Sequence, residues 1–511
     1  MPYKGEMEKG GDILDKVLVI LEVSQKQNYI FASKKLRENA ERSGDIAYVT
    51  SNAFFQEIAA ELYREEDNLV YSGGGHTVLQ FRDSAQATAF AKRVTEAVLR
   101  RYSGLELFVK QTPYDDTKTP GDNLKDLSAR LERKKALRRA GFRQLSFGVE
   151  ALDNESFLPR IRERSPIRRP WQNEALKPPA GWEFPAEFEK LAGEDNFIAV
   201  THIDGNAMGK RVDRVYQRFS QDWESCRAGL RRFSRSIQRD FEQTFLEMAD
   251  EIAHQFPELA PALPVRPVIL AGDDVCFVSA GSIGLECARV FLEKLAAKTN
   301  AEDGERYAAC AGVALVHTKF PFHRAYDLAE ELCSNAKKFG AVLDPEGRVS
   351  AMDWHIEFGQ LKDSLTELRE DYACEDGGRM ELRPVAVIVP DGCGDPGVRT
   401  YTFFKSLCLA IQDGRGKIAR SKIKELRQAF KQGRLESEYF LHDKQIGDLL
   451  YRAVAAKHPS QDWWIQYKDK LFKGGCIEKN AFQKVGDTYR CLFFDAIEMV
   501  DHFTAFEEVD A

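Results

Sequence analysis

The chain has 511 residues, of which 43% are hydrophobic and 30% charged, a composition that excludes a disordered or collagen-like protein. Its formal net charge of -7, from 73 basic and 80 acidic side chains, argues against a protein that coats nucleic acid with its whole surface. No apolar run approaches the roughly 20 residues that a membrane-spanning helix needs, and the charged amino-terminal residues predict no secretory signal. The ten cysteines contain no C-x-x-C pair, so we expect reduced thiols in a cytoplasmic protein.

The first part of the chain contains one copy of an internal repeat. Residues 16–22 have a buried-strand pattern, and residues 29–43 are predicted to be one helical stretch. Residues 68–81 indicate a strand, a glycine turn and a second strand. The copy is completed by a helix over 85–101, a strand over 105–110 and a basic helix over 124–139.

The same order of elements recurs later in the chain. A strand is predicted over residues 196–203, a helical stretch over 228–254, and a strand, turn and strand over 267–279. A helix over 285–297, a strand over 308–316 and a helix over 325–338 follow. A β-α-β-β-α-β unit repeated in tandem predicts an α+β protein with two ferredoxin-like palm domains, of the nucleotide cyclase or polymerase type.

Four segments are therefore predicted along the chain. They are a first palm over 1–150, an Arg- and Pro-rich connector over 151–192, a second palm over 193–400 and a mostly helical C-terminal domain over 401–511. Basic runs at 130–143 and 415–431 are candidates for RNA phosphate contacts. The commoner explanation of such runs is a solvated helix face, which we favour.

Three acidic residues of the second copy are predicted to meet. Asp204 ends its first strand, while Asp273 and Asp274 form the turn of its central hairpin, and these two places are neighbours in a palm sheet. Three carboxylates there suit two divalent cations that activate a hydroxyl and neutralise a triphosphate. Oxygen-only ligands favour Mg²⁺ or Mn²⁺ over zinc. An Asp-Asp turn is often only structural, but its position between two apolar strands favours metal binding.

Residues around these acids are predicted to bind the nucleotide phosphates. The loop after the first strand precedes a helical stretch, where backbone N–H groups can hold phosphate. A glycine in the hairpin turn leaves room for a substrate. A lysine late in the last helix could neutralise the phosphate tail, although such lysines more often complement the helix dipole or face water. The predicted phosphate-binding residues are Gly205, Asn206, Ala207, Met208, Gly209, Gly272 and Lys337.

The first copy lacks two of the three acidic residues. Its hairpin turn is Ser72, Gly73, Gly74 and Gly75, followed by a histidine, so a glycine and a histidine stand where the second copy has two aspartates. We therefore predict that the first palm is not catalytic. Its three glycines either admit a nucleotide close to the backbone or only make a tight hairpin, and both interpretations remain open.

Several of these motifs resemble those of the large polymerase/cyclase subunit of type III CRISPR effector complexes, whose core is two palm domains followed by a helical domain. The similar segments are VSQKQNYIF at 23–31, SGGGH at 72–76, DGNAMG at 204–209, AGDD at 271–274 and the strand and helix at 311–338. The resemblance implies that ATP is converted into a cyclic oligoadenylate in antiviral defence, and that both palms contribute to nucleotide binding.

The chain also departs from that family's pattern. Glu22 takes the place of an aspartate in the first palm, and Ala271 replaces the first glycine of the Gly-Gly-Asp-Asp turn. The first palm begins within the opening twenty residues, which predicts a short form lacking the HD nuclease domain. The expected partners are ATP, RNA or CRISPR effector subunits, and a second copy of the chain. The alternatives are a non-catalytic scaffold that binds RNA and partner proteins, or a cyclase that uses GTP.

Overall fold

The structure is a computed structural model of the whole chain. It describes residues 16–102, 104–137, 176–192, 195–359, 362, 364–413, 420–444 and 481–507. The contacts divide the chain into two compact units, an N-terminal unit of Met1–Lys177, Met208–Arg239 and Asn300–Gly304, and a C-terminal unit of Pro178–Ala207, Asp240–Thr299 and Glu305–Ala511. Most of the connector predicted over 151–192 and the end of the basic run at 130–143 lie outside the described residues. The predicted domain boundaries stay predictions.

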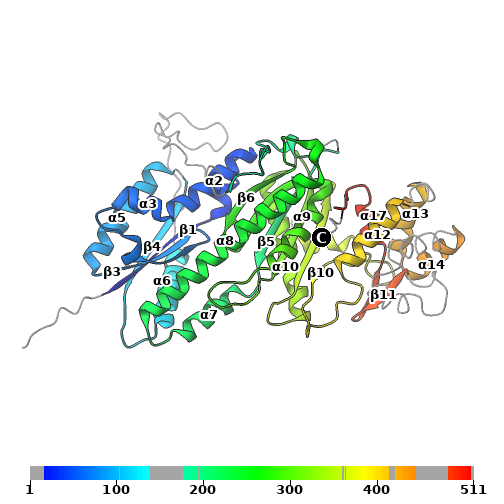
Figure 1. Cartoon of the computed structure of the whole chain (residues 1–511). Helices are drawn as coiled ribbons and strands as arrows, with labels where there is room; N and C mark the ends of the chain where they lie inside the picture. The colour runs from blue at the N-terminus through cyan, green and yellow to red at the C-terminus, as the bar shows by residue number, and fades with distance from the viewer. Residues whose placement is uncertain are drawn as a thin grey trace, which may run out of the picture. The chain divides into compact units, whose positions relative to one another are not determined.

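The N-terminal unit contains a four-stranded antiparallel sheet in the order β2-β3-β1-β4 (Figure 1). Its strands are β1 (Val17–Ser24), β2 (Leu69–Gly73), β3 (His76–Phe81) and β4 (Glu106–Pro113). The first five residues of β1 are at most 3% exposed, which explains the continuous apolar run in the sequence, because β1 lies between two neighbours with both faces covered. The strand-turn-strand prediction for residues 68–81 is confirmed.

The helices of the N-terminal unit differ from the prediction in two respects, because the sequence did not predict the short helices at Asn52–Ala59 and Glu65–Asn68, and one predicted helix is divided. The helix predicted over 29–43 is two helices, because α1 ends at Ile30 and α2 starts at Leu36. The Ser33 hydroxyl donates to Glu38 and accepts from the Lys35 N–H, so local side-chain bonds replace helical ones there. The helices are α1 (Lys26–Ile30), α2 (Leu36–Val49), α3 (Asn52–Ala59), α4 (Glu65–Asn68), α5 (Ser84–Arg101), α6 (Pro120–Ala136), α7 (Met208–Arg218) and the start of α8 (Trp223–Gln255).

The C-terminal unit contains a six-stranded sheet in the order β10-β9-β8-β5-β7-β6. The strands are β5 (Phe197–Gly205), β6 (Val265–Ala271), β7 (Asp274–Ala280), β8 (Ala309–His317), β9 (Ser350–Glu357) and β10 (Val385–Ile388). Four strands form the antiparallel palm sheet that the repeat predicts. The sequence did not predict β9 and β10, which extend the sheet, with β9 parallel to β8.

Helices and a small hairpin complete the C-terminal unit. The helix α10 (Phe322–Leu343) connects β8 to β9 and packs on β8 (Figure 1). The other helices are the remainder of α8, α9 (Gly284–Ala296), α11 (Leu365–Glu370), α12 (Tyr401–Asp413), α13 (Arg420–Gln432), α14 (Arg434–Asp443) and α17 (Phe494–Met499), with short 3-10 helices at Phe188–Lys190, Pro257–Leu259 and Gly281–Ile283. Beyond residue 400 the described part is mostly helical, with one hairpin of β11 (Phe482–Val485) and β12 (Thr488–Cys491).

Two expectations drawn from composition can be compared with the described residues. All nine described cysteines are free, and all but Cys393 are buried, which agrees with the expected reduced thiols. Cys476 lies outside the described residues. None of the helices in the described ranges has the length and apolar character required to cross a bilayer.

Candidate nucleotide and metal site

Three acidic residues lie at one end of two neighbouring strands in the C-terminal unit. Asp204 on β5 stands opposite Asp274 on β7 in the antiparallel register. The Gly205 N–H donates to the backbone oxygen of Asp273 over 3.2 Å, which holds the hairpin turn against the end of β5. The turn passes through Gly272 with φ of 72°, a conformation that side chains disfavour. The predicted meeting of these two chain segments is therefore present.

The electrostatic environment of this end of the sheet favours a cation. Burial, together with the charges of Asp204 and Asp274, raises the pKa of Asp273 to about 6. His202 is the nearby histidine of β5, and its Nδ1 lies 3.6 Å from a carboxylate oxygen of Asp274. Burial lowers the pKa of His202, so its ring is neutral at pH 7 and does not balance the carboxylates. A positive charge placed among the three carboxylates would relieve their mutual repulsion.

Lys337 supplies one such charge from α10. Its ammonium nitrogen lies 2.5 Å from Asp204 Oδ2 and 3.0 Å from the Gly205 carbonyl oxygen. Burial by itself lowers the pKa of Lys337, but the adjacent Asp204 carboxylate outweighs it and raises the pKa, so the ammonium stays charged. The neighbouring Lys338 is exposed. The structure thus places Lys337 within the acidic cluster, whereas its sequence position favoured solvent or the helix dipole.

The oxygen-only donor set fits Mg²⁺ or Mn²⁺ by residue type. Within the described ranges, however, no three His, Cys, Asp or Glu side chains are gathered closely enough to hold a metal ion. One oxygen of Asp204 is bonded to the Lys337 ammonium, which acts as an internal counterion. Metal binding by Asp204, Asp273 and Asp274 therefore remains a prediction.

Some hydrogen-bond donors of the loop after β5 are already bonded to other parts of the protein. The Asn206 N–H donates to the Ala308 carbonyl over 2.8 Å, and its side-chain amide donates to the Val349 carbonyl over 2.9 Å. Ala207 has φ of 56°, in the left-handed region that is uncommon for alanine. These bonds tie the loop to the starts of β8 and β9, which favours an anchoring role for Asn206. Met208 and Gly209 open α7, and their predicted phosphate binding remains a prediction.

The glycine turn of the first palm is occupied by contacts within its own unit. The Ser72 hydroxyl donates to the Thr50 carbonyl over 3.0 Å, and Lys26 donates to the Gly74 carbonyl. A Cβ at Gly73 would lie 3.2 Å from Ser234 Oγ, and a Cβ at Gly75 would lie 2.9 Å from the Ile46 side chain. These contacts explain why glycines stand at the turn. They support the tight-hairpin interpretation, while nucleotide binding there remains a prediction.

A lysine-carboxylate pair occurs in the first palm as well, and the sequence interpretation missed it. Lys135 on α6 lies 2.7 Å from Glu22, which stands opposite His76 in the register. Burial lowers the pKa of His76 to about 4, so the ring is neutral. Lys135 and Lys337 each lie in the helix that follows the last strand of their repeat. That shared position is the signal by which the repeat could have revealed both pairs.

Comparisons with known proteins identify the second copy. Residues 197–341 match the family model of the second palm domain of Cas10/Cmr2. A search of curated proteins found no match. Among solved structures, the Csm1-Csm4 cassette in complex with cA4 is 13% identical at a TM-score of 0.52, with 96% of this chain and 70% of that chain covered. The complex with cA3 is 14% identical at a TM-score of 0.52, with 95% and 69% covered.

The apo Csm1-Csm4 cassette gives a shorter match. It is 16% identical at a TM-score of 0.44, and the match covers 65% of this chain and 54% of that chain. The chain therefore spans little more than half the length of that relative. The shared fold agrees with the predicted α+β palm architecture, and the family match assigns residues 197–341 to a Cas10/Cmr2 second palm domain.

Proposed function

We propose that this Cas10-like chain is a nucleotidyltransferase that joins ATP into a cyclic oligoadenylate at the acidic end of β5 and β7. The observation that carries the proposal is that Asp204 stands opposite Asp274, next to the turn that contains Asp273, with the Lys337 ammonium 2.5 Å from Asp204. The same arrangement lies inside the segment that matches the second palm of Cas10/Cmr2.

Each residue is assigned a role that its surroundings permit. Asp204, Asp273 and Asp274 would hold Mg²⁺ or Mn²⁺, which when bound lowers the pKa of the attacking ribose hydroxyl and neutralises the triphosphate. Lys337 carries a positive charge at Asp204, so its ammonium is available to bind a phosphate oxygen when that carboxylate turns to a cation. Gly272 leaves the turn without a side chain where the nucleotide would approach.

The choice of ATP over GTP, and of a partner subunit over a second copy, rests on the structural relatives. Those structures are complexes of a Csm1-Csm4 cassette with cA4 and with cA3. We therefore propose ATP as substrate and a CRISPR effector subunit as partner. GTP use and a homodimer have no such support and remain the less favoured alternatives.

The experiment is a product assay on the full chain, purified alone and with any co-purifying subunit or RNA. Labelled ATP or GTP is incubated with Mg²⁺ or Mn²⁺, and products are identified by chromatography and mass spectrometry. Changing Asp273→Asn together with Asp274→Asn should lower product formation on the order of 10³-fold, since such groups stabilise transition-state charge. The thermal midpoint should change little.

Two adjacent lysines provide a matched control. Lys337→Gln removes the charge next to Asp204 and should lower kcat/KM on the order of 10-fold to 100-fold, a typical loss for one charge-assisted phosphate contact. Lys338→Gln removes the same charge one residue further along α10, where the side chain is exposed, and should stay within about two-fold of the unchanged protein.

Two outcomes would overturn the proposal. Full activity in the double aspartate variant would place the chemistry elsewhere. Absence of any product with every partner, nucleotide and metal, together with ATP affinity that does not depend on Asp273 and Asp274, would instead identify a non-catalytic scaffold. Salt-dependent RNA binding by that inactive protein would then support the scaffold function.

A further inference from the structure

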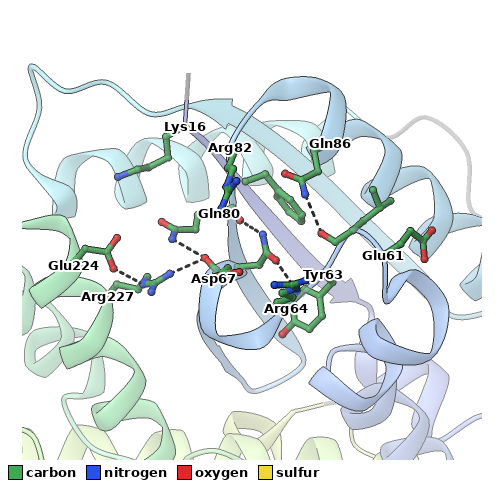
Figure 2. Close-up of a pocket in the computed structure, with 13 residues that line it drawn as sticks. Lys16, Glu61, Tyr63, Arg64, Asp67, Gln80, Arg82, Gln86, Glu224 and Arg227 are labelled. Atoms are coloured by element: carbon green, nitrogen blue, oxygen red, sulfur yellow. Dashed lines mark hydrogen bonds and ion pairs between the residues drawn. The ribbon is translucent and has the colours of Figure 1, made fainter. Parts of the chain in front are cut away.

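The N-terminal unit contains a cavity at the end of β3 away from the glycine turn. It has a volume of about 550 Å³, which lies within the range of small-ligand pockets. Lys16 at the start of β1, the loop between α3 and α4, the first turn of α5 and the start of α8 surround it. Figure 2 shows its polar side chains converging from these separate elements.

The floor of the cavity is a rigid network of amide groups. The Asn68 side chain accepts from the Arg64 N–H over 2.8 Å and donates to the Gln80 carbonyl over 2.8 Å. The Gln80 side chain donates to the Asp67 carbonyl over 2.8 Å (Figure 2). It also accepts from the Trp223 indole N–H over 2.6 Å. This network satisfies the buried polar groups and fixes the position of the residues around the opening.

The guanidinium group of Arg227 is bonded to neighbouring residues of the protein and is not available to a ligand. Its guanidinium donates to the carbonyls of Glu66 and Asp67 over 3.0 and 2.8 Å. It also forms an ion pair with Glu224 over 3.1 Å (Figure 2). The charges of Arg227 and Glu224 therefore compensate each other. Glu61, another acid of the lining, is paired with Arg93 outside it.

Two arginines of the lining have no such compensation. Arg64 and Arg82 are exposed, and neither forms an ion pair or a side-chain hydrogen bond with any residue that the structure describes. Lys16 adds a third positive charge, with its ammonium 4.7 Å from the Tyr114 ring centre and 5.1 Å from that of Trp223. Asp67 is the remaining uncompensated acid of the lining, so the cavity carries an excess of positive charge.

We propose that this cavity is an anion-binding site for phosphate groups, separate from the acidic end of the second palm. The guanidinium groups of Arg64 and Arg82 would bind phosphate oxygens as two-pronged donors, with Lys16 as a supporting point charge. The phosphates can belong to a free nucleotide or to a nucleic-acid backbone, because both present the same oxygens.

The lining indicates that the site reads charge and not the identity of a base. Its aromatic residues Tyr63 and Phe81 are at most 2% exposed, so their rings offer no stacking surface. Trp223 and Tyr114 face the Lys16 ammonium. Binding should therefore vary little with base sequence and strongly with ionic strength.

The test uses the full chain in EDTA, so that divalent cations make no contribution. Sodium tripolyphosphate is titrated by calorimetry, and a fluorescein-labelled octauridylate by anisotropy at several salt concentrations. Combining Arg64→Gln with Arg82→Gln should weaken tripolyphosphate binding at least about 10-fold. For the oligonucleotide, the slope of log K against log salt should fall by about 1.4, or about 0.7 for each lost charge on a single strand.

A matched control removes two charges elsewhere in the same unit. Arg37 and Arg100 are exposed, each pairs with a glutamate one turn away, and neither lines the cavity. Changing both to glutamine should leave tripolyphosphate affinity within about two-fold, since they take part only in surface ion pairs. Thermal melting of both double variants checks that each remains folded.

The outcomes separate the sources and can refute the site. Loss of both probes in the Arg64 and Arg82 variant supports a site open to free nucleotides, and loss of the oligonucleotide alone supports a backbone site. Equal losses in the cavity variant and the control would overturn the proposal, as would failure of the unchanged protein to bind either probe. Binding of polyglutamate in place of both phosphate probes would overturn the phosphate assignment.

Discussion

Gly312 on β8 lies where the backbone of α10 presses on the sheet. A Cβ built at this position would lie 1.9 Å from the Ala329 carbonyl oxygen and 2.3 Å from the Cys333 nitrogen, whereas ordinary contacts begin at 3.4 Å. Both obstacles are backbone atoms of a helix and cannot rotate away. Gly312→Ala should therefore force α10 away from β8 by more than 1 Å through a core that is fully buried.

The expected cost follows from overpacking. Extra methyl groups in a packed core typically cost 1–3 kcal/mol when side chains can adjust. Because backbone must move here, Gly312→Ala should lower the free energy of unfolding by about 3 kcal/mol or more. The shift would also carry Lys337 away from Asp204, so any activity should fall further than stability alone explains.

Gly340 in the same helix provides a control with the same chemical change. A Cβ there would lie 3.4 Å from the nearest atom, the Val349 carbonyl oxygen, and so fits without displacement. Gly340→Ala should be neutral or stabilise the helix by up to about 1 kcal/mol. Guanidinium unfolding followed by circular dichroism measures both variants. Equal unfolding midpoints for the two would refute the close approach of α10 to Gly312.

Three further predictions concern other buried polar groups. Arg383 is 1% exposed and lies 2.8 Å from Glu498, so Arg383→Met should lower the free energy of unfolding by about 3–5 kcal/mol. The double variant Arg383→Met with Glu498→Leu should recover part of this loss in denaturant unfolding. Strictly additive effects of the two substitutions would contradict the pairing. Burial raises the pKa of Asp45 to about 6, so the contribution of Asp45 to stability falls as pH rises from about 4 through 6. Across that pH range the free energy of unfolding of Asp45→Asn should rise by up to roughly 3 kcal/mol relative to that of the unchanged protein. Parallel curves of stability against pH for the two proteins would argue against this prediction. Trp223→Phe loses the bond to Gln80 and should cost about 1 kcal/mol in thermal unfolding, with no change expected if that bond is absent.

The order of the elements and the position of the acidic turn could be predicted from sequence because both depend on local pattern. The apolar run of β1, the glycine turn before His76 and the Asp-Asp turn after Gly272 are each encoded within a few neighbouring residues. The repeat then assigned Asp204 to the strand beside that turn, and the antiparallel register agrees. Local pattern failed at Ser33, where side-chain hydrogen bonds ended a helix that apolar spacing alone would have continued.

Only the tertiary structure decided which distant side chains meet. Lys337 reaches Asp204 across 133 positions, and Lys135 reaches Glu22 across 113. The cavity lined by Arg64 and Arg82 likewise gathers residues from separate strands and helices. Apolar periodicity predicts which face of an element is buried, but the position of a charged residue in the sequence does not predict which distant residue it will contact. Which face of a helix turns toward the sheet depends on the packing of the whole unit, and that packing converts scattered lysines and arginines into counterions and candidate sites.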